Sequence, residues 1–125
     1  MGKVKKKKDL PIDVVKGGLP ISGLFDLEPI VKCFVNEWMQ MSIEDGQRNS
    51  PVENLPEIGC PLIVAVGGDE TNEFRRQSKD FSNLWQSRGW KANYLECRDL
   101  NHFNAPLELC KSNSQMTEEL LAMIN

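Results

Sequence analysis

The chain has 125 residues, of which 40% are hydrophobic and 26% are charged, values that are typical of a single globular domain and exclude a long disordered chain. Five of the fifteen basic residues lie in the first eight positions, so residues 9–125 carry ten basic and eighteen acidic side chains, a net charge of −8. The acidic body, which has no pattern of basic and aromatic residues, argues against a nucleic-acid-binding protein. No apolar run approaches the roughly 18 residues of a membrane span, so we expect no membrane partner.

The first nine residues are predicted to form a basic disordered tail, and residues 10–125 the folded part of the chain. Asp9 and Asp13 lie where a secretory signal would have its apolar stretch, so we predict a cytoplasmic protein without such a signal. The cysteines show no metal-ligand spacing and the chain has one histidine, so we expect free, buried thiols and neither a metal nor another cofactor. These cysteines are Cys33, Cys60, Cys97 and Cys110.

The first half of the chain contains short predicted elements. Apolar and β-branched residues favour a strand over Val14–Ile21, although two glycines weaken it. Short helices are predicted over Glu28–Val35 and Asn36–Met41. Residues 43–59 are polar, contain two prolines and two glycines, and predict a long surface loop.

The clearest predicted element is the continuous apolar run Pro61–Val66, which is typical of an inner strand that is buried on both faces of a parallel sheet. An amphipathic helix is predicted over 72–88, with Gly89 as its C-terminal cap. Its apolar stripe consists of Phe74, Ser78, Phe81, Leu84 and Trp85.

A further strand is predicted over Lys91–Cys97, a short helix over 105–111 capped by Asn104, and a last helix over 115–124 capped by Ser114. Strands that alternate with helices predict the α/β class, with about three parallel strands and flanking helices. The side chains expected to supply much of the core are Phe34, Trp38, Phe81, Trp85 and Trp90.

Ligands of a parallel sheet gather at the carboxyl ends of its strands. The polar residues that follow the predicted strands are Ser22, Asp26, Asp69, Glu70, Asp99, Asn101 and His102. An acid after one strand and a histidine after the next is the order of the last two members of the Ser…acid…His triad of an α/β-hydrolase. In such a triad the histidine is the general base, and the carboxylate fixes its tautomer and stabilises the imidazolium.

Four segments carry a more specific resemblance: GGLPISGLFDLEPI (17–30), SPVENLP (50–56), PLIVAVGGDETNEFRRQSKDF (61–81) and NHF (101–103). Together they resemble the carboxyl-terminal half of the kynurenine formamidase (arylformamidase) branch of the α/β-hydrolases, and related carboxylesterases share these phrases. The resemblance implies a partial α/β-hydrolase fold over residues 10–125. It also implies a small-molecule formamide or ester, such as N-formylkynurenine of tryptophan catabolism, as the substrate of the complete enzyme.

The resemblance also assigns candidate catalytic residues. Counted back from the EFRRQS phrase, the catalytic acid matches Glu70, with Asp69 as the second choice, and the catalytic histidine matches His102. The segment that begins at Ser22 resembles one that shapes the site. From the residues themselves we interpret Ser22 and Asp26 as turn residues whose side chains bond to local backbone.

The sequence contains neither the G-x-S-x-G nucleophile turn nor an HGGG-type oxyanion loop. We therefore expect a truncated, carboxyl-terminal part of a hydrolase that lacks its nucleophile and is inactive alone. Two alternatives are a non-catalytic half-fold that pairs with itself or with a partner chain through an open sheet edge, and a small enzyme that uses Cys97 with His102.

Overall fold

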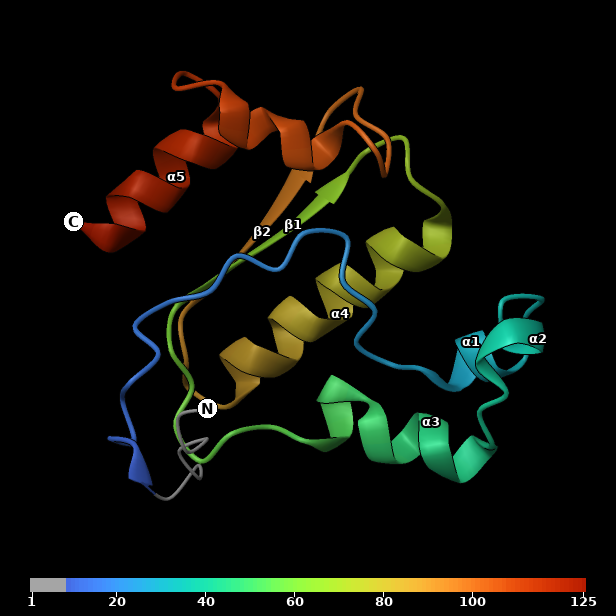
Figure 1. Cartoon of the computed structure of the whole chain (residues 1–125). Helices are drawn as coiled ribbons and strands as arrows, with labels where there is room; N and C mark the ends of the chain where they lie inside the picture. The colour runs from blue at the N-terminus through green and yellow to red at the C-terminus, as the bar shows by residue number, and fades with distance from the viewer. Residues whose placement is uncertain (1–8) are drawn as a thin grey trace, which may run out of the picture.

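The computed structural model describes residues 9–125, so the predicted disordered tail, apart from Asp9, lies outside the described residues. Two strands, β1 (Leu62–Gly67) and β2 (Ala92–Cys97), pair in parallel along their whole length. Parallel strands need a crossover connection, and helix α4 (Asn72–Ser87) provides it (Figure 1). The predicted α/β class is confirmed, as are the strand at 61–66 and the helix at 72–88 to within one residue at each end.

A third segment lies beside β1, but it is not the continuous strand that was predicted over Val14–Ile21. Only two parallel bridges form, between Gly18 and Leu62 and between Ile21 and Ala65. The sheet therefore has two complete strands, with β1 flanked on its other edge by this bridged segment.

Pro20 explains why the third strand is interrupted. The N–H groups of Gly18 and Ser22 donate to β1 over 3.0 and 2.9 Å. In a parallel ladder the N–H of the residue between them would also point at β1, toward the carbonyl of Ile63. Proline has no N–H, so the ladder loses one hydrogen bond at its middle position.

The side chains of β1 alternate between two apolar layers, as successive residues of a strand must. Val64 packs with Phe81 and Trp85 of α4 on one face. Ile63 and Ala65 pack on the other face with Met116 of α5 (Gln115–Ile124), which Figure 1 shows on the side of the sheet opposite α4. Burial on both faces explains the unbroken apolarity of this strand.

The helix ends follow the predicted capping residues in two places. Gly89 has φ +81° directly after the C-cap of α4, a conformation that favours glycine. Ser114 caps α5, and its hydroxyl accepts from the Thr117 N–H over 3.1 Å. The element at Ala105–Cys110 is a 3-10 helix, η3, and Asn104 makes no side-chain cap to it, contrary to prediction.

The segment before β1 differs most from its prediction. Helices α1 (Glu28–Val31) and α2 (Asn36–Met39) are shorter than expected. The predicted loop at 43–59 is wrong at its start, which forms helix α3 (Ile43–Asn49) and the 3-10 helix η2 (Pro51–Glu53).

A capping box explains helix α3. The hydroxyl of Ser42 accepts from the N–H of Asp45, and the carboxylate of Asp45 accepts from the N–H of Ser42, over 3.0 and 3.1 Å. Each side chain thereby satisfies a backbone donor that the first helical turn leaves free. The S-x-x-D spacing of this pair indicates the start of a helix, but Gly46, which directly follows it, favoured the prediction of a loop.

The aromatic core prediction is correct for part of its members. Phe81 and Trp85 are buried and Trp90 is partly buried against them, whereas Phe34 and Trp38 are 70% and 77% exposed. The cysteines are free as predicted, but three are half-buried and Cys110 is exposed. Within residues 9–125, none of the helices has the length and apolarity needed to cross a membrane.

Candidate active site

Glu70 lies in the tight turn between β1 and α4. Its N–H donates to the carbonyl of Gly67 over 3.1 Å, and its side chain folds back so that Oε2 accepts from the N–H of Gly67 over 2.6 Å. The carboxyl side chain has no solvent-exposed surface. A buried carboxylate needs hydrogen-bond donors in place of water, and the end of β1 provides one of them.

His102 reaches Glu70 from the loop that follows β2. Its Nδ1 lies 2.7 Å from Oε1 of Glu70. The ring of Phe74, on the first turns of α4, packs on the imidazole with 4.9 Å between ring centroids. The imidazole is 48% exposed, so one side of it is fixed by protein contacts and the other is open.

The backbone of the β1–α4 turn holds the histidine loop in place. Gly68 N–H donates to the carbonyl of Cys97 over 2.8 Å, and Asp69 N–H donates to the carbonyl of Leu100 over 3.0 Å. A Cβ atom at Gly67 would overlap the Leu100 carbonyl. Glycine at this position therefore permits the close approach that brings the loop to Glu70.

Two asparagines fix the loop around His102. The Oδ1 atom of Asn101 accepts from the N–H groups of Phe103 and Asn104, each over 2.9 Å. The Oδ1 atom of Asn104 accepts in return from the N–H of Asn101 over 2.6 Å. This reciprocal pair is an Asx-type turn, and it occupies the amide side chain that was expected to cap the following helix.

The other predicted site residues lie in different environments. Asp69 is exposed, and its carboxylate is not the one that contacts His102. Ser22 does not bond to local backbone as interpreted, because its hydroxyl donates to Oε2 of Glu70 over 2.5 Å. Asp26 does bond locally, with its Oδ1 accepting from the N–H of Glu28 over 3.0 Å.

Three contacts of the pair were not foreseen from the sequence, namely those of Ser22, the Gly67 amide and Phe74. Phe74 lies in the first turn of α4, directly after the turn that carries Glu70, and the sequence indicated it only as part of the apolar stripe of that helix. Ser22 and Glu70 are 48 positions apart, and only the rule that strand ends converge related them.

The arrangement determines the role of each imidazole nitrogen. An ionised carboxylate only accepts hydrogen bonds, so Nδ1 of His102 donates to Glu70. The neutral ring then leaves Nε2 without a proton and free to act as a base. The catalytic roles of Glu70 and His102 stay predictions, and the geometry is the one that such roles require.

Cys97 is in a poor environment for a nucleophile. Burial raises the pKa of its thiol, and the negative charges of Glu108, Glu119 and Glu70 raise it further. The thiolate is the reactive form, so these surroundings work against the alternative in which Cys97 attacks a substrate.

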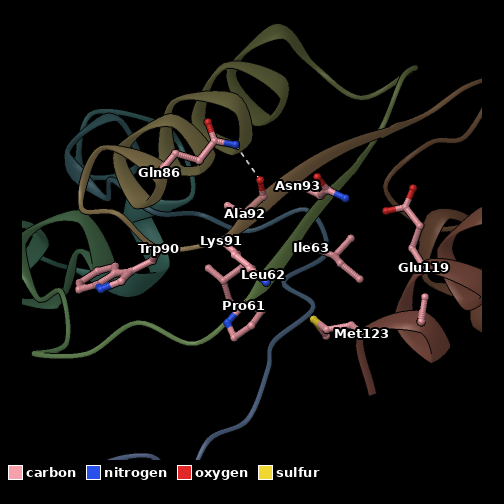
Figure 2. Close-up of a pocket in the computed structure, with 11 residues that line it drawn as sticks. Pro61, Leu62, Ile63, Gln86, Trp90, Lys91, Ala92, Asn93, Glu119 and Met123 are labelled. Atoms are coloured by element: carbon pink, nitrogen blue, oxygen red, sulfur yellow. Dashed lines mark hydrogen bonds between the residues drawn. The ribbon is translucent and has the colours of Figure 1, made fainter. Parts of the chain in front are cut away.

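A hollow of about 490 Å³ lies at the opposite end of the sheet (Figure 2). Pro61 and Leu62 at the start of β1, Trp90 after α4 and Met123 of α5 line it, and Gln86 at its edge donates to the Ala92 carbonyl over 2.7 Å. Neither member of the acid–histidine pair borders this hollow, which is at the amino ends of the strands. In the described part of the chain, no cluster of three or more His, Cys, Asp or Glu side chains is arranged to hold a metal.

Comparison with known proteins identifies relatives of the chain. Over 115 residues it is 34% identical to a kynurenine formamidase from Danio rerio, and over 116 residues it is 34% identical to one from Salmo salar. These matches cover 88% of this chain but 39% and 40% of the relatives. The chain therefore spans about two fifths of the length of the curated relatives that it matches. No protein-family profile matches it.

Solved structures share the fold. A proposed thioesterase from Silicibacter sp. TM1040 matches with a TM-score of 0.72 and 27% identity, over 82% of this chain and 37% of that one. An acylaminoacyl peptidase from Pyrococcus horikoshii matches with a TM-score of 0.62 and 15% identity, over 90% of this chain and 20% of that one. The predicted resemblance is confirmed: the chain is a homologue of the kynurenine formamidases over most of its length, and it has part of an α/β-hydrolase fold.

Proposed function

We propose that this chain supplies the acid and the histidine of a serine hydrolase that acts on an aryl formamide, with N-formylkynurenine as the expected substrate. The observation that carries the proposal is the bond between buried Glu70 and half-exposed His102 at the carboxyl ends of the strands. The formamidase relatives support the reaction class. A carboxylic ester is the second substrate class, since ester and formamide hydrolysis use the same triad.

In the proposed reaction, Nε2 of His102 takes the proton of a serine hydroxyl as its oxygen attacks the formyl carbon. The same proton then goes to the leaving amine as the C–N bond breaks, and water later releases formate from the serine by the reverse sequence. Glu70 stabilises the imidazolium in both steps. The required G-x-S-x-G turn does not occur in these 125 residues, so we propose that a segment outside them supplies the serine and that this chain alone is inactive.

A chimera tests this proposal. The matched segment of the Danio rerio kynurenine formamidase is replaced by this chain, and hydrolysis of N-formylkynurenine and of p-nitrophenyl acetate is measured. We expect turnover of both substrates. We expect His102→Ala and Glu70→Gln to lower kcat/KM by about 100-fold or more.

Asp69→Asn is the matched control, because it removes the neighbouring carboxylate and leaves the contact with His102 unchanged. Its kcat/KM should stay within about twofold of the unmodified chimera, as for a surface change away from the reacting atoms. A folded but inactive chimera would argue against the proposed function. Loss of activity in Asp69→Asn alone would move the catalytic acid from Glu70 to Asp69.

A second candidate function is pairing of the chain with itself or with a partner. The segment 18–21 is bridged to β1 on one side, and among the described residues the sheet continues no further in that direction. An open edge of this kind is a template for another strand. Sedimentation equilibrium over a range of concentrations tests self-pairing, and a monomer at all concentrations would contradict it.

We also propose that the protein is located in the cytoplasm.

A further inference from the structure

We propose that Ser22 is a positioning residue for the catalytic acid, because its hydroxyl fixes one oxygen of Glu70 so that the other faces His102. The catalytic part of this inference rests on the proposed function. The positioning part concerns only the geometry of the acid–histidine pair, and it is testable without any hydrolytic activity.

The hydrogen bonds of Glu70 divide between its two oxygens. Oε2 accepts from the Ser22 hydroxyl over 2.5 Å and from the Gly67 N–H over 2.6 Å, while Oε1 is 2.7 Å from Nδ1 of His102. Without the Ser22 hydroxyl, Oε2 would accept only from the Gly67 N–H, and the carboxylate would rotate more easily about its last side-chain bond, whose torsional preference is broad. Two donors on Oε2, from two different strand ends, fix the plane of the group and therefore the position of Oε1.

The surroundings make these bonds strong. Ser22 is 8% exposed and the carboxyl side chain of Glu70 is fully buried. Hydrogen bonds to an ionised group are shorter and about twice as strong as neutral ones, and exclusion of water strengthens them further. Ser22 also adds no positive charge that would oppose the imidazolium form of His102.

The backbone of Ser22 supports a role for its side chain. Its φ is +52°, in the left-handed region, where a residue with a Cβ is strained and glycine is not. Its N–H donates to the Ala65 carbonyl over 2.9 Å, which holds the residue at the end of the bridged segment. A serine in a position that glycine would occupy without strain implies that its hydroxyl contributes a specific contact, and among residues 9–125 this hydroxyl donates to Glu70.

The tautomer of neutral His102 is the direct measure of positioning. The chain has one histidine, so the two imidazole nitrogens are observed without overlap by ¹⁵N NMR at alkaline pH. In the unmodified chain we expect the proton on Nδ1. If Oε1 is no longer fixed, the proton redistributes toward Nε2. We expect Ser22→Ala to lower the ratio of the Nδ1–H to the Nε2–H form by about fivefold, the effect of one hydrogen bond of ordinary strength.

Ser22→Gly separates the hydroxyl from the backbone, because it removes the same hydroxyl and also relieves the strain at φ +52°. Ser50→Ala is the matched control. Ser50 is equally a buried serine, and its hydroxyl donates to the Gly46 carbonyl over 2.7 Å and accepts from the Leu27 N–H over 2.8 Å. It contacts neither Glu70 nor His102 through these bonds, so the tautomer ratio should not change.

A fall in the ratio in both Ser22 variants, with none in Ser50→Ala, supports the proposal. An unchanged ratio in the Ser22 variants would overturn it, and so would a normal ratio in Ser22→Gly together with a fall in Ser22→Ala, because the backbone alone would then be responsible. If Ser22→Ala does not fold, the tautomer ratio of the less strained Ser22→Gly variant alone tests the proposal.

Steady-state kinetics of the chimera give a second measurement. Ser22→Gly should lower kcat and leave KM nearly unchanged. An inactive chimera would contradict the proposed function and leave the tautomer result standing.

Discussion

Glu70 and His102 are 32 positions apart in the sequence, and their side chains meet over 2.7 Å between Oε1 and Nδ1. The bond joins the turn after β1 to the loop after β2 at one edge of the sheet. The carboxylate is buried and the imidazole is half-exposed. The pair therefore has its carboxylate fixed inside the protein and its imidazole partly open to solvent, as a general base that meets a reacting group requires.

Replacement of Glu70 by Gln should cost stability as well as activity. The amide has the shape of the carboxyl group, but one of its two ends donates, and all three partners of Glu70 present donors. Loss of the hydrogen bonds to the charged carboxylate costs about 1.5–3 kcal/mol, even when His102 changes tautomer so that Nδ1 accepts from the amide. Urea unfolding followed by circular dichroism should show this loss in the free energy of unfolding. Asp69→Asn, at an exposed position, should change it by no more than about 0.5 kcal/mol, and equal losses in the two variants would contradict the assigned contacts.

Gly67→Ala should displace the histidine loop. A Cβ at Gly67 would overlap the carbonyl of Leu100, a backbone atom that moves only if the loop moves. Overpacking of this kind costs about 1–3 kcal/mol, and the NMR signals of His102 should shift. Gly68→Ala is the control, since its Cβ would lie 3.4 Å from the Cys97 carbonyl, and its effect should stay within about 1 kcal/mol. Similar behaviour of the two variants would contradict the close approach.

Pro20→Ala should complete the interrupted third strand. The new N–H at position 20 is placed to donate to β1, as the N–H groups of Gly18 and Ser22 do. Hydrogen exchange should show this amide protected by about tenfold or more relative to a free amide. Pro56→Ala, at an exposed loop position, gives the matched unprotected amide. Equal exchange at positions 20 and 56 would contradict the explanation.

Cys97 should react slowly with thiol reagents. Its pKa is raised, chiefly by burial and then by the charge of Glu108, so less thiolate forms at a given pH. At pH 8, labelling followed by mass spectrometry should modify exposed Cys110 before Cys97. The unfolded thiol loses its proton near pH 8.5, so this group's contribution to stability is complete below that pH and is lost as pH rises through the raised folded pKa. Labelling of Cys97 before Cys110 would contradict this expectation and support the alternative in which Cys97 is a nucleophile.

The long, strongly patterned elements could be predicted from the sequence. The apolar run of β1 and the apolar stripe of α4 indicate which side chains are buried. The capping residues Gly89 and Ser114 indicate where the helices end and begin. Helix α3 was missed because its signal is a single capping box, Ser42 with Asp45, in a polar segment. Pro20 is a further case, since its missing N–H matters only once the neighbouring strand is known.

The site was predictable to the extent that strand ends converge. That rule, with the resemblance, singled out Glu70 and His102, and it placed Ser22 at the same edge. It did not reveal which atoms meet, because the left-handed backbone of Ser22 and the tight turn at Gly67 determine where these side chains point. Local sequence patterns carry no information on contacts across 48 positions.

The measurement that tests the central claim most directly is the tautomer of neutral His102 in the unmodified chain. A donor bond from Nδ1 to Glu70 predicts ¹⁵N shifts of a protonated Nδ1 and an unprotonated Nε2 at alkaline pH. Glu70→Gln should shift the proton in part to Nε2, while Asp69→Asn should leave it on Nδ1. A proton on Nε2 in the unmodified chain would contradict the claim that Glu70 and His102 form the acid–base pair of a hydrolase.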